Sequence, residues 1–229
     1  NILKGQFEGK FDETVITATT LTEAEAQAYL GDLLLHSHRK DAYTYLEKAL
    51  KLDPNLAMAH ASLGMAYFRE GKTNEARASL ERAVTANSQN YLAHYYYAYT
   101  LSRTGPDDAP TGVTYSSDAA AKMREHLRKA IALRPDFPEP YGLLAFVNLV
   151  TSTDIDETIT ALKRVLSTSP GQHDIRYMLG QLYLHKNDLK TARELLEQVA
   201  KSSVDEQTRA HAETLVSEIR TMEEQQKAR

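Results

Sequence analysis

Apolar residues recur at helical spacings of three and four along most of the chain, and the same arrangement returns at intervals of about 34 residues. The clearest copy spans residues 57–88, where Gly71 and Lys72 separate two apolar patterns. The first pattern carries Leu63, Gly64 and Tyr67, and the second carries Ala76, Leu80 and Ala83. Small residues that alternate with large ones let two helices approach closely, so this stretch predicts a helical hairpin.

Further copies of the pattern lie on both sides of this one. The expected repeats span residues 24–55, 57–88, 91–135, 138–170 and 173–204. Pro54, Pro135 and Pro170 close three of them, and proline ends a helix because it cannot continue the hydrogen-bond ladder. A single hairpin would be a weak signal, but about five in register predict an all-α array over residues 22–204.

The two ends of the chain differ from the repeats. Residues 205–229 have apolar side chains at helical spacing with charges between them, which predicts one amphipathic helix that caps the array. Residues 1–21 have no clear period, and we expect an irregular lead-in. Thr22 and Ser203 each precede a glutamate by three residues, the spacing of a capping box at the start of a helix.

The third repeat contains an inserted loop, which we expect over residues 104–117. The segment is rich in Gly, Pro, Asp and Ser, the residues that favour turns. Either Ser117 or Asp118 is suited to cap the helix that follows, and Tyr115 is the large side chain of the loop.

Composition narrows the classes of partner. The chain has 229 residues, a net charge of −4 and no cysteine. Acidic and basic residues are mixed, so no broad basic face for nucleic acid is predicted. No apolar run approaches the length of about 18 residues that would insert into a membrane. The chain begins with Asn1, which leaves room for a domain upstream.

The repeat resembles the tetratricopeptide repeat (TPR). In residues 57–88 all but two of the family's signature sites are matched in kind, with His60 in place of Trp and Ser88 in place of Pro. The resemblance implies a right-handed α-α superhelix of about five helix-turn-helix repeats with a C-terminal capping helix. It also implies a protein- or peptide-binding scaffold.

In this family the first helix of each repeat lines the concave face, and the resemblance therefore assigns ligand-facing positions. These positions give an aromatic and Met-rich groove. The candidate binding residues are Tyr29, Met65, Arg69, Tyr95, Tyr96, Tyr99, Arg103, Phe146, Tyr177 and Gln181. The Lys and Asn residues with which some relatives grip a C-terminal carboxylate are replaced here by Ala61, Met65, Tyr95 and others. The alternative for Tyr95 and Tyr99 is that they only pack against their neighbours.

No catalytic motif stands out. His36 and His38 are two residues apart, so on a helix they point to different sides and cannot share a metal ion. His60 and His94 recur at one repeat position, where we expect them to pack between helices. We find no phosphate-binding loop, nucleophile elbow or zinc-protease motif, so we expect neither an enzyme nor a bound metal or cofactor.

Three functions stay open at this point. The first is a scaffold that binds a protein or peptide. The second is an accessory C-terminal region of a larger, possibly enzymatic, multi-domain protein, an arrangement that this array resembles in bacterial proteins. The third is self-association into a homo-oligomer through the terminal helix, with Leu215, Ile219 and Met222 as its apolar face.

Overall fold

The computed structural model describes residues 21–37, 41–103 and 114–227, and this part of the chain consists of α-helices joined by turns. Residues 1–20 of the predicted lead-in and residues 104–113 of the predicted loop lie outside the described residues. The eleven helices are α1 (Glu23–His36), α2 (Ala42–Leu52), α3 (Ala57–Arg69), α4 (Thr73–Thr85), α5 (Tyr91–Ser102), α6 (Ser117–Leu133), α7 (Glu139–Val150), α8 (Ile155–Thr168), α9 (His173–His185), α10 (Leu189–Ser202) and α11 (Glu206–Lys227).

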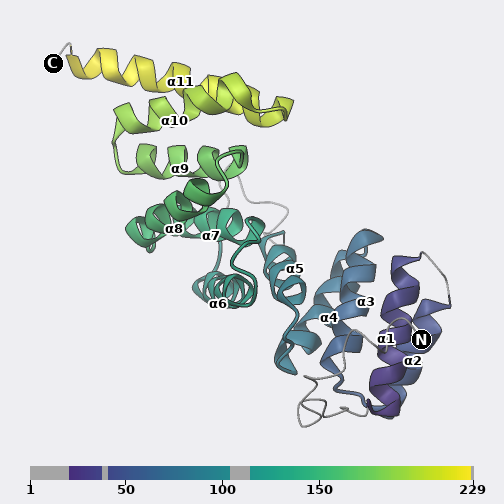
Figure 1. Ribbon diagram of the computed structural model, residues 1–229. Coiled ribbons are helices and arrows are strands. Elements are labelled where there is room, and N and C mark those ends of the chain that lie inside the picture. The colour runs from purple at the N-terminus through teal and green to yellow at the C-terminus, as the bar shows by residue number, and fades with distance from the viewer. Residues whose placement is uncertain (1–20, 38–40, 104–113, 228–229) are drawn as a thin grey trace, which may run out of the picture.

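The helices stack in chain order into an elongated array, with α1 and α11 at its opposite ends (Figure 1). Each odd-numbered helix from α1 to α9 packs against the even-numbered helix that follows it, and each such hairpin packs against the next. The first helices of successive hairpins also touch in the pairs α1–α3, α3–α5 and α7–α9. This arrangement confirms the prediction of an all-α solenoid of helical hairpins.

Three of the hairpins are closed by a glycine that lies beneath a leucine. A Cβ atom added at Gly64 would lie 2.5 Å from Cγ of Leu80, and one at Gly31 would lie 2.6 Å from Cγ of Leu46. Gly180 meets Leu196 in the same way, at 2.8 Å. The helices of these hairpins are therefore closer than any side chain at the glycine would allow.

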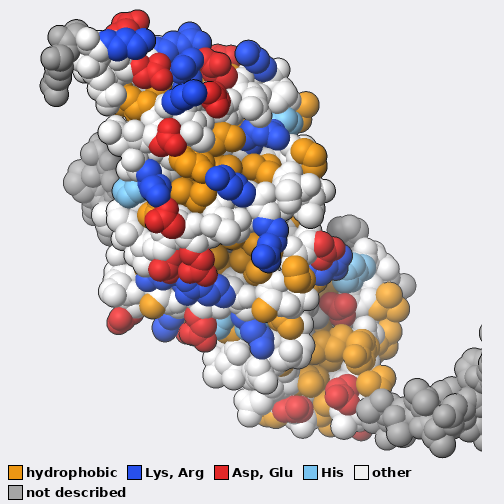
Figure 2. Space-filling view, turned by 60° about the vertical axis from the view of Figure 1, so that its left-hand side comes forward, with side chains coloured by type: hydrophobic (Ala, Val, Ile, Leu, Met, Phe, Trp, Pro, Cys, Tyr) orange, Lys and Arg blue, Asp and Glu red, His pale blue; other side chains and the backbone are white. Residues whose placement is uncertain are grey.

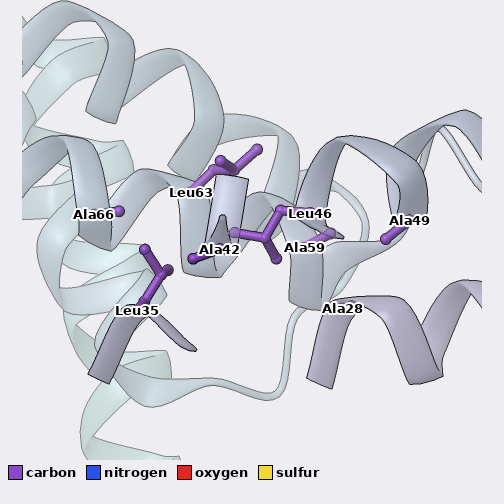
Figure 3. Close-up of a cluster of buried hydrophobic side chains, with 8 residues drawn as sticks. All are labelled: Ala28, Leu35, Ala42, Leu46, Ala49, Ala59, Leu63 and Ala66. Atoms are coloured by element: carbon purple, nitrogen blue, oxygen red, sulfur yellow. The ribbon is translucent and has the colours of Figure 1, made fainter. Parts of the chain in front are cut away.

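Alanine and leucine side chains fill the space between neighbouring hairpins. Figure 3 shows one such core, in which α1, α2 and α3 contribute side chains that point toward one another. Leu46 is fully buried there, and burying a leucine contributes roughly 1.5–3 kcal/mol. The members of this core are Ala28, Leu35, Ala42, Leu46, Ala49, Ala59, Leu63 and Ala66.

One side chain near the start of each of four successive first helices donates a hydrogen bond to the carbonyl six residues earlier. His60 Nε2 lies 2.8 Å from the oxygen of Pro54, and His94 Nε2 lies 2.9 Å from that of Ser88. The other two bonds run from Tyr141 Oη to Pro135 (3.1 Å) and from Arg176 Nη2 to Pro170 (2.5 Å). The two histidines are thus buried between helices, as their repeat position predicted.

Two of the predicted helix starts need correction. The Thr22–Glu25 capping box is present, but α6 is capped by Ser116, whose Oγ accepts from Ala119 N at 3.2 Å. Neither Ser117 nor Asp118 is the cap, because both already lie inside the helix. At α11 the Asp205 carboxylate accepts from Thr208 N at 2.6 Å, so Asp205 takes the role expected of Ser203.

Helix α11 lies along α10 and also touches α9. Ala212 and Ile219 are fully buried against α10, and Leu215 is half-buried beside them. Arg220 reaches Glu197 of α10 at 2.9 Å. Most of the apolar face predicted for self-association is therefore occupied within the chain, and Met222 is its exposed member. Among the described helices, none has the length and apolar character needed to cross a membrane.

Candidate functional site

Six aromatic rings form one continuous cluster on the first helices of repeats two and three. Helix α3 supplies Phe68, α5 supplies four tyrosines, and the turn before α7 supplies Phe137. We call this group the aromatic cluster, and its members are Phe68, Tyr91, Tyr95, Tyr96, Tyr99 and Phe137.

The rings of the aromatic cluster are in direct contact. Phe68 lies 4.5 Å from Tyr96 and 5.5 Å from Tyr99, measured between ring centroids. Tyr95 lies 5.1 Å from Tyr96 and 5.4 Å from Phe137, which it meets edge-on. These separations fall in the range where aromatic pairs attract one another beyond the burial of their area. The cluster is therefore one packed surface rather than a set of separate side chains.

Packing and exposure coexist in this cluster, and the ligand-facing role of Tyr95 and Tyr99 stays a prediction. Tyr95 packs against the core between α5, α6 and α7, and Tyr96 packs against that between α3, α4 and α5. Tyr95, Tyr96 and Tyr99 nevertheless keep part of their surface exposed. Within the described residues, none of their three hydroxyls forms a hydrogen bond, so each is able to donate to a ligand.

Burial, together with the nearby carboxylate of Glu139, raises the pKa of Tyr95 to about 12. The phenol therefore stays neutral at any ordinary pH. A neutral phenol with a free O–H is suited to recognise a carbonyl oxygen through one hydrogen bond and an apolar group through its ring.

Two arginines lie at the same end of the aromatic cluster. Arg69 follows Phe68 directly at the end of α3, and Arg103 follows Tyr99 by one helical turn at the end of α5. Both are exposed, and neither forms an ion pair with a described residue. The carboxylate next to Arg69, that of Glu70, is engaged by Lys72 and by the Tyr43 hydroxyl instead.

The other predicted residues lie apart from this cluster. Met65 is half-buried in the core beneath it, and Phe146 of α7 meets Tyr115 edge-on at 6.4 Å. On α9, Gln181 Nε2 donates to the hydroxyl of Tyr177 at 3.3 Å. Tyr29 is 52% exposed on α1. The structure therefore brings together Arg69 of α3 and the predicted residues of α5, and it places Met65 in the core beneath them and the remaining ones at separate points along the array.

Two members of the aromatic cluster were missed by the sequence analysis. Phe68 lies on the same helical face as Met65, three residues on, so the period of α3 was a signal for it. Phe137 lies in a turn, between Asp136 and Pro138, where no period exists. Only the fold shows that its ring meets Tyr91 at 5.1 Å and Tyr95 at 5.4 Å.

Two aromatic residues outside the helices, Phe137 and Tyr115, lie between α5 and α7, the first helices of repeats three and four. Phe137 comes from the turn before α7 and packs on α5, as described above. Tyr115 comes from the segment before α6, donates from its hydroxyl to the Ser102 carbonyl at 3.3 Å, and contacts Phe146 of α7. The surface that carries the aromatic cluster therefore continues onto α7.

A pair of histidines lies behind the aromatic cluster, between α5 and α6. Nδ1 of His94 is 3.0 Å from Nδ1 of His126, and the two rings stack at 5.2 Å. Because Nε2 of His94 donates to the Ser88 carbonyl, a neutral His94 accepts at Nδ1 and His126 donates. Burial lowers the pKa of both imidazoles. No group of three or more potential metal ligands occurs within the described ranges.

Family models identify the repeats directly. Three models described as tetratricopeptide repeat match residues 45–78, 62–105 and 149–217. The chain matches no curated protein in sequence.

Several solved structures share the fold. The TPR protein YrrB, described as having an unusual peptide-binding site, is 21% identical with a TM-score of 0.67, covering 83% of this chain and 92% of its own. PilF of Pseudomonas aeruginosa is 19% identical with a TM-score of 0.59, covering 90% of this chain and 86% of its own. TTC0263 of Thermus thermophilus is 19% identical with a TM-score of 0.53, covering 84% and 98%. The repeat models and the stacked hairpins agree: the chain belongs to the tetratricopeptide repeat family.

Proposed function

We propose that the chain is a protein-interaction scaffold that holds a peptide, or an extended segment of a partner protein, across the aromatic cluster. The observation that carries this proposal is the cluster itself. Six rings in contact, with part of the surface of Tyr95, Tyr96 and Tyr99 exposed, present apolar area that costs little side-chain entropy to immobilise.

The surface of the array as a whole supports the same function. Repeat arrays offer long continuous surfaces for binding, and hydrophobic side chains gather in patches on this one, as Figure 2 shows. Charged side chains are densest near the C-terminal end of the array in that view. An apolar patch among polar surroundings is typical of an interaction site. YrrB, which shares the fold, is described by its peptide-binding site.

Site-specific photo-crosslinking in the source cell tests this proposal. A benzoylphenylalanine placed at Tyr99 should crosslink a partner, and the same residue at Tyr45 on α2 should not, because Tyr45 belongs to the second helix of its hairpin. The variant Tyr95→Ala/Tyr99→Ala should lose that partner in a pull-down while Tyr45→Ala keeps it. Equal helicity by circular dichroism is the control for folding. A partner retained by the double variant would contradict the proposal.

The accessory-region and self-association alternatives remain predictions. Repeat arrays of this family are typically scaffolds without catalytic activity. An analytical ultracentrifugation series over concentration would reveal self-association, and Met222 is the exposed apolar residue of α11 to substitute in that case.

A further inference from the structure

The charges around the aromatic cluster are arranged unevenly. The two arginines described above, Arg69 and Arg103, lie at the ends of adjacent helices, α3 and α5. Glu139, in the first turn of α7, lies toward Tyr95 and Phe137 at the other side of the cluster. The cluster therefore has two arginines, its positive rim, at one end, and Glu139 with the paired Arg134 and Asp136 at the other.

No described residue forms an ion pair with the positive rim. Several exposed basic side chains elsewhere on the surface are paired: Arg128 with Asp154 at 2.8 Å, Lys72 with Glu70 at 2.7 Å, and Arg134 with Asp136 at 2.9 Å. Arg69 and Arg103 have no such partner among the described residues. An arginine presents a planar fork of donors that matches a carboxylate, so an unpaired couple beside an apolar surface favours an acidic ligand.

We infer that the aromatic cluster binds a peptide in which an aromatic or large aliphatic side chain is followed or preceded, within a few residues, by Asp or Glu. The apolar side chain lies on the rings of Phe68, Tyr96 and Tyr99, and the acidic side chain faces Arg69 and Arg103. Free hydroxyls of the tyrosines donate to the peptide carbonyls. This inference rests on the proposed function and specifies the partner's chemistry at the same surface.

A selection from a phage-displayed library of random dodecapeptides tests the inference with the full chain as bait. The baits are the wild type, Arg69→Glu/Arg103→Glu, Tyr95→Ala/Tyr99→Ala, and a matched control, Arg82→Glu/Arg164→Glu. Arg82 and Arg164 are also exposed, but they lie on the second helices α4 and α8, so the control makes the same change in charge elsewhere. Circular dichroism of all four baits shows whether each is folded.

We expect the wild type and the control to select peptides enriched in Asp or Glu near an aromatic or aliphatic residue. Arg69→Glu/Arg103→Glu should lose that enrichment and bind a selected peptide on the order of tenfold more weakly, since exposed ion pairs contribute modestly and two are reversed. The difference should shrink at high salt. Selection without acidic enrichment, or enrichment that survives the reversal, would overturn the inference.

The same experiment separates this inference from the proposed function. Peptides that need Tyr95 and Tyr99 but show no acidic preference would leave the proposed function standing and refute the inference. Peptides that bind Tyr95→Ala/Tyr99→Ala as well as the wild type would refute the proposed function and the inference with it. A wild type that selects no peptide above background would count against both.

Discussion

The hairpin of α3 and α4 and the hairpin of α7 and α8 follow one repeat pattern but fill their interiors differently. In the first, Gly64 lies beneath Leu80, and Tyr67 packs on the core that includes Ala76. In the second, Ala145 takes the glycine position.

Polar side chains also enter the interior of the second hairpin. The amide of Asn148 donates to the hydroxyl of Thr158 at 2.9 Å, and both side chains are buried. The Oδ1 atom of Asn148 has no hydrogen-bond partner among the described residues. The comparison shows that one repeat pattern accommodates both a closely packed apolar hairpin and a less tightly closed hairpin with a buried polar pair.

The largest expected effect comes from opening the tight hairpin. Gly64→Val should destabilise the chain by about 3 kcal/mol, because the added side chain would overlap Leu80. Gly171→Val is the matched control: a Cβ there meets no atom within 4 Å, and the change should stay within about 0.5 kcal/mol. Urea unfolding followed by circular dichroism measures both. Similar losses in the two variants would show that the loss in Gly64→Val does not come from overlap with Leu80.

The polar pair of the looser hairpin should give the next largest effect. Thr158→Ala should cost about 1–3 kcal/mol, because it leaves the buried amide of Asn148 without its acceptor. Replacing both residues, as Asn148→Leu/Thr158→Ala, should recover most of that loss by removing the buried polar group altogether. Equilibrium unfolding measures the free energy of unfolding of both variants. A double variant less stable than Thr158→Ala would show that the pair stabilises the hairpin.

A smaller loss of stability is expected on acidification. Its source is the hairpin of α5 and α6, which lies between the two hairpins compared above. Burial lowers the pKa of His94 and His126, and for His126 the neighbouring His94 lowers it further. The unfolded chain, with imidazole pKa values of about 6.5, therefore binds more protons, and stability should fall as the pH drops through that value. The difference between the thermal midpoints at pH 7.5 and pH 5.5 should be smaller in His126→Gln than in the wild type. An unchanged pH dependence in that variant would exclude the pair as its source.

The smallest effect concerns the ion pair that links α6 to the start of α8. Arg128 and Asp154 lie 2.8 Å apart, but their side chains are 48% and 36% exposed. Solvent screening should therefore limit the loss in Arg128→Ala to about 0.5 kcal/mol, and less in 0.5 M salt. Thermal unfolding at low and high salt measures it. A loss comparable to that of Thr158→Ala would mean that the looser hairpin depends on this surface contact.

The hairpins were predictable from the sequence because a repeated pattern of small and large residues has few ways to pack. Ala57 and His173, the first residues of two predicted repeats, are also the first residues of α3 and α9. Helix caps were less predictable, since Ser116 and Ser117 are adjacent and chemically identical. The grouping of predicted binding residues depended on contacts between segments far apart in the sequence, such as that of Phe137 with Tyr95.

The hydrogen bond repeated at the start of α3, α5, α7 and α9 bears on how the array responds to force. Its acceptor belongs to the turn that ends one hairpin, and its donor belongs to the first helix of the next. His, Tyr and Arg all make it, so the position demands a donor of sufficient reach and not one particular residue type. Because the bond recurs at all four junctions between hairpins, we expect a pulling force to load each junction through an equivalent contact.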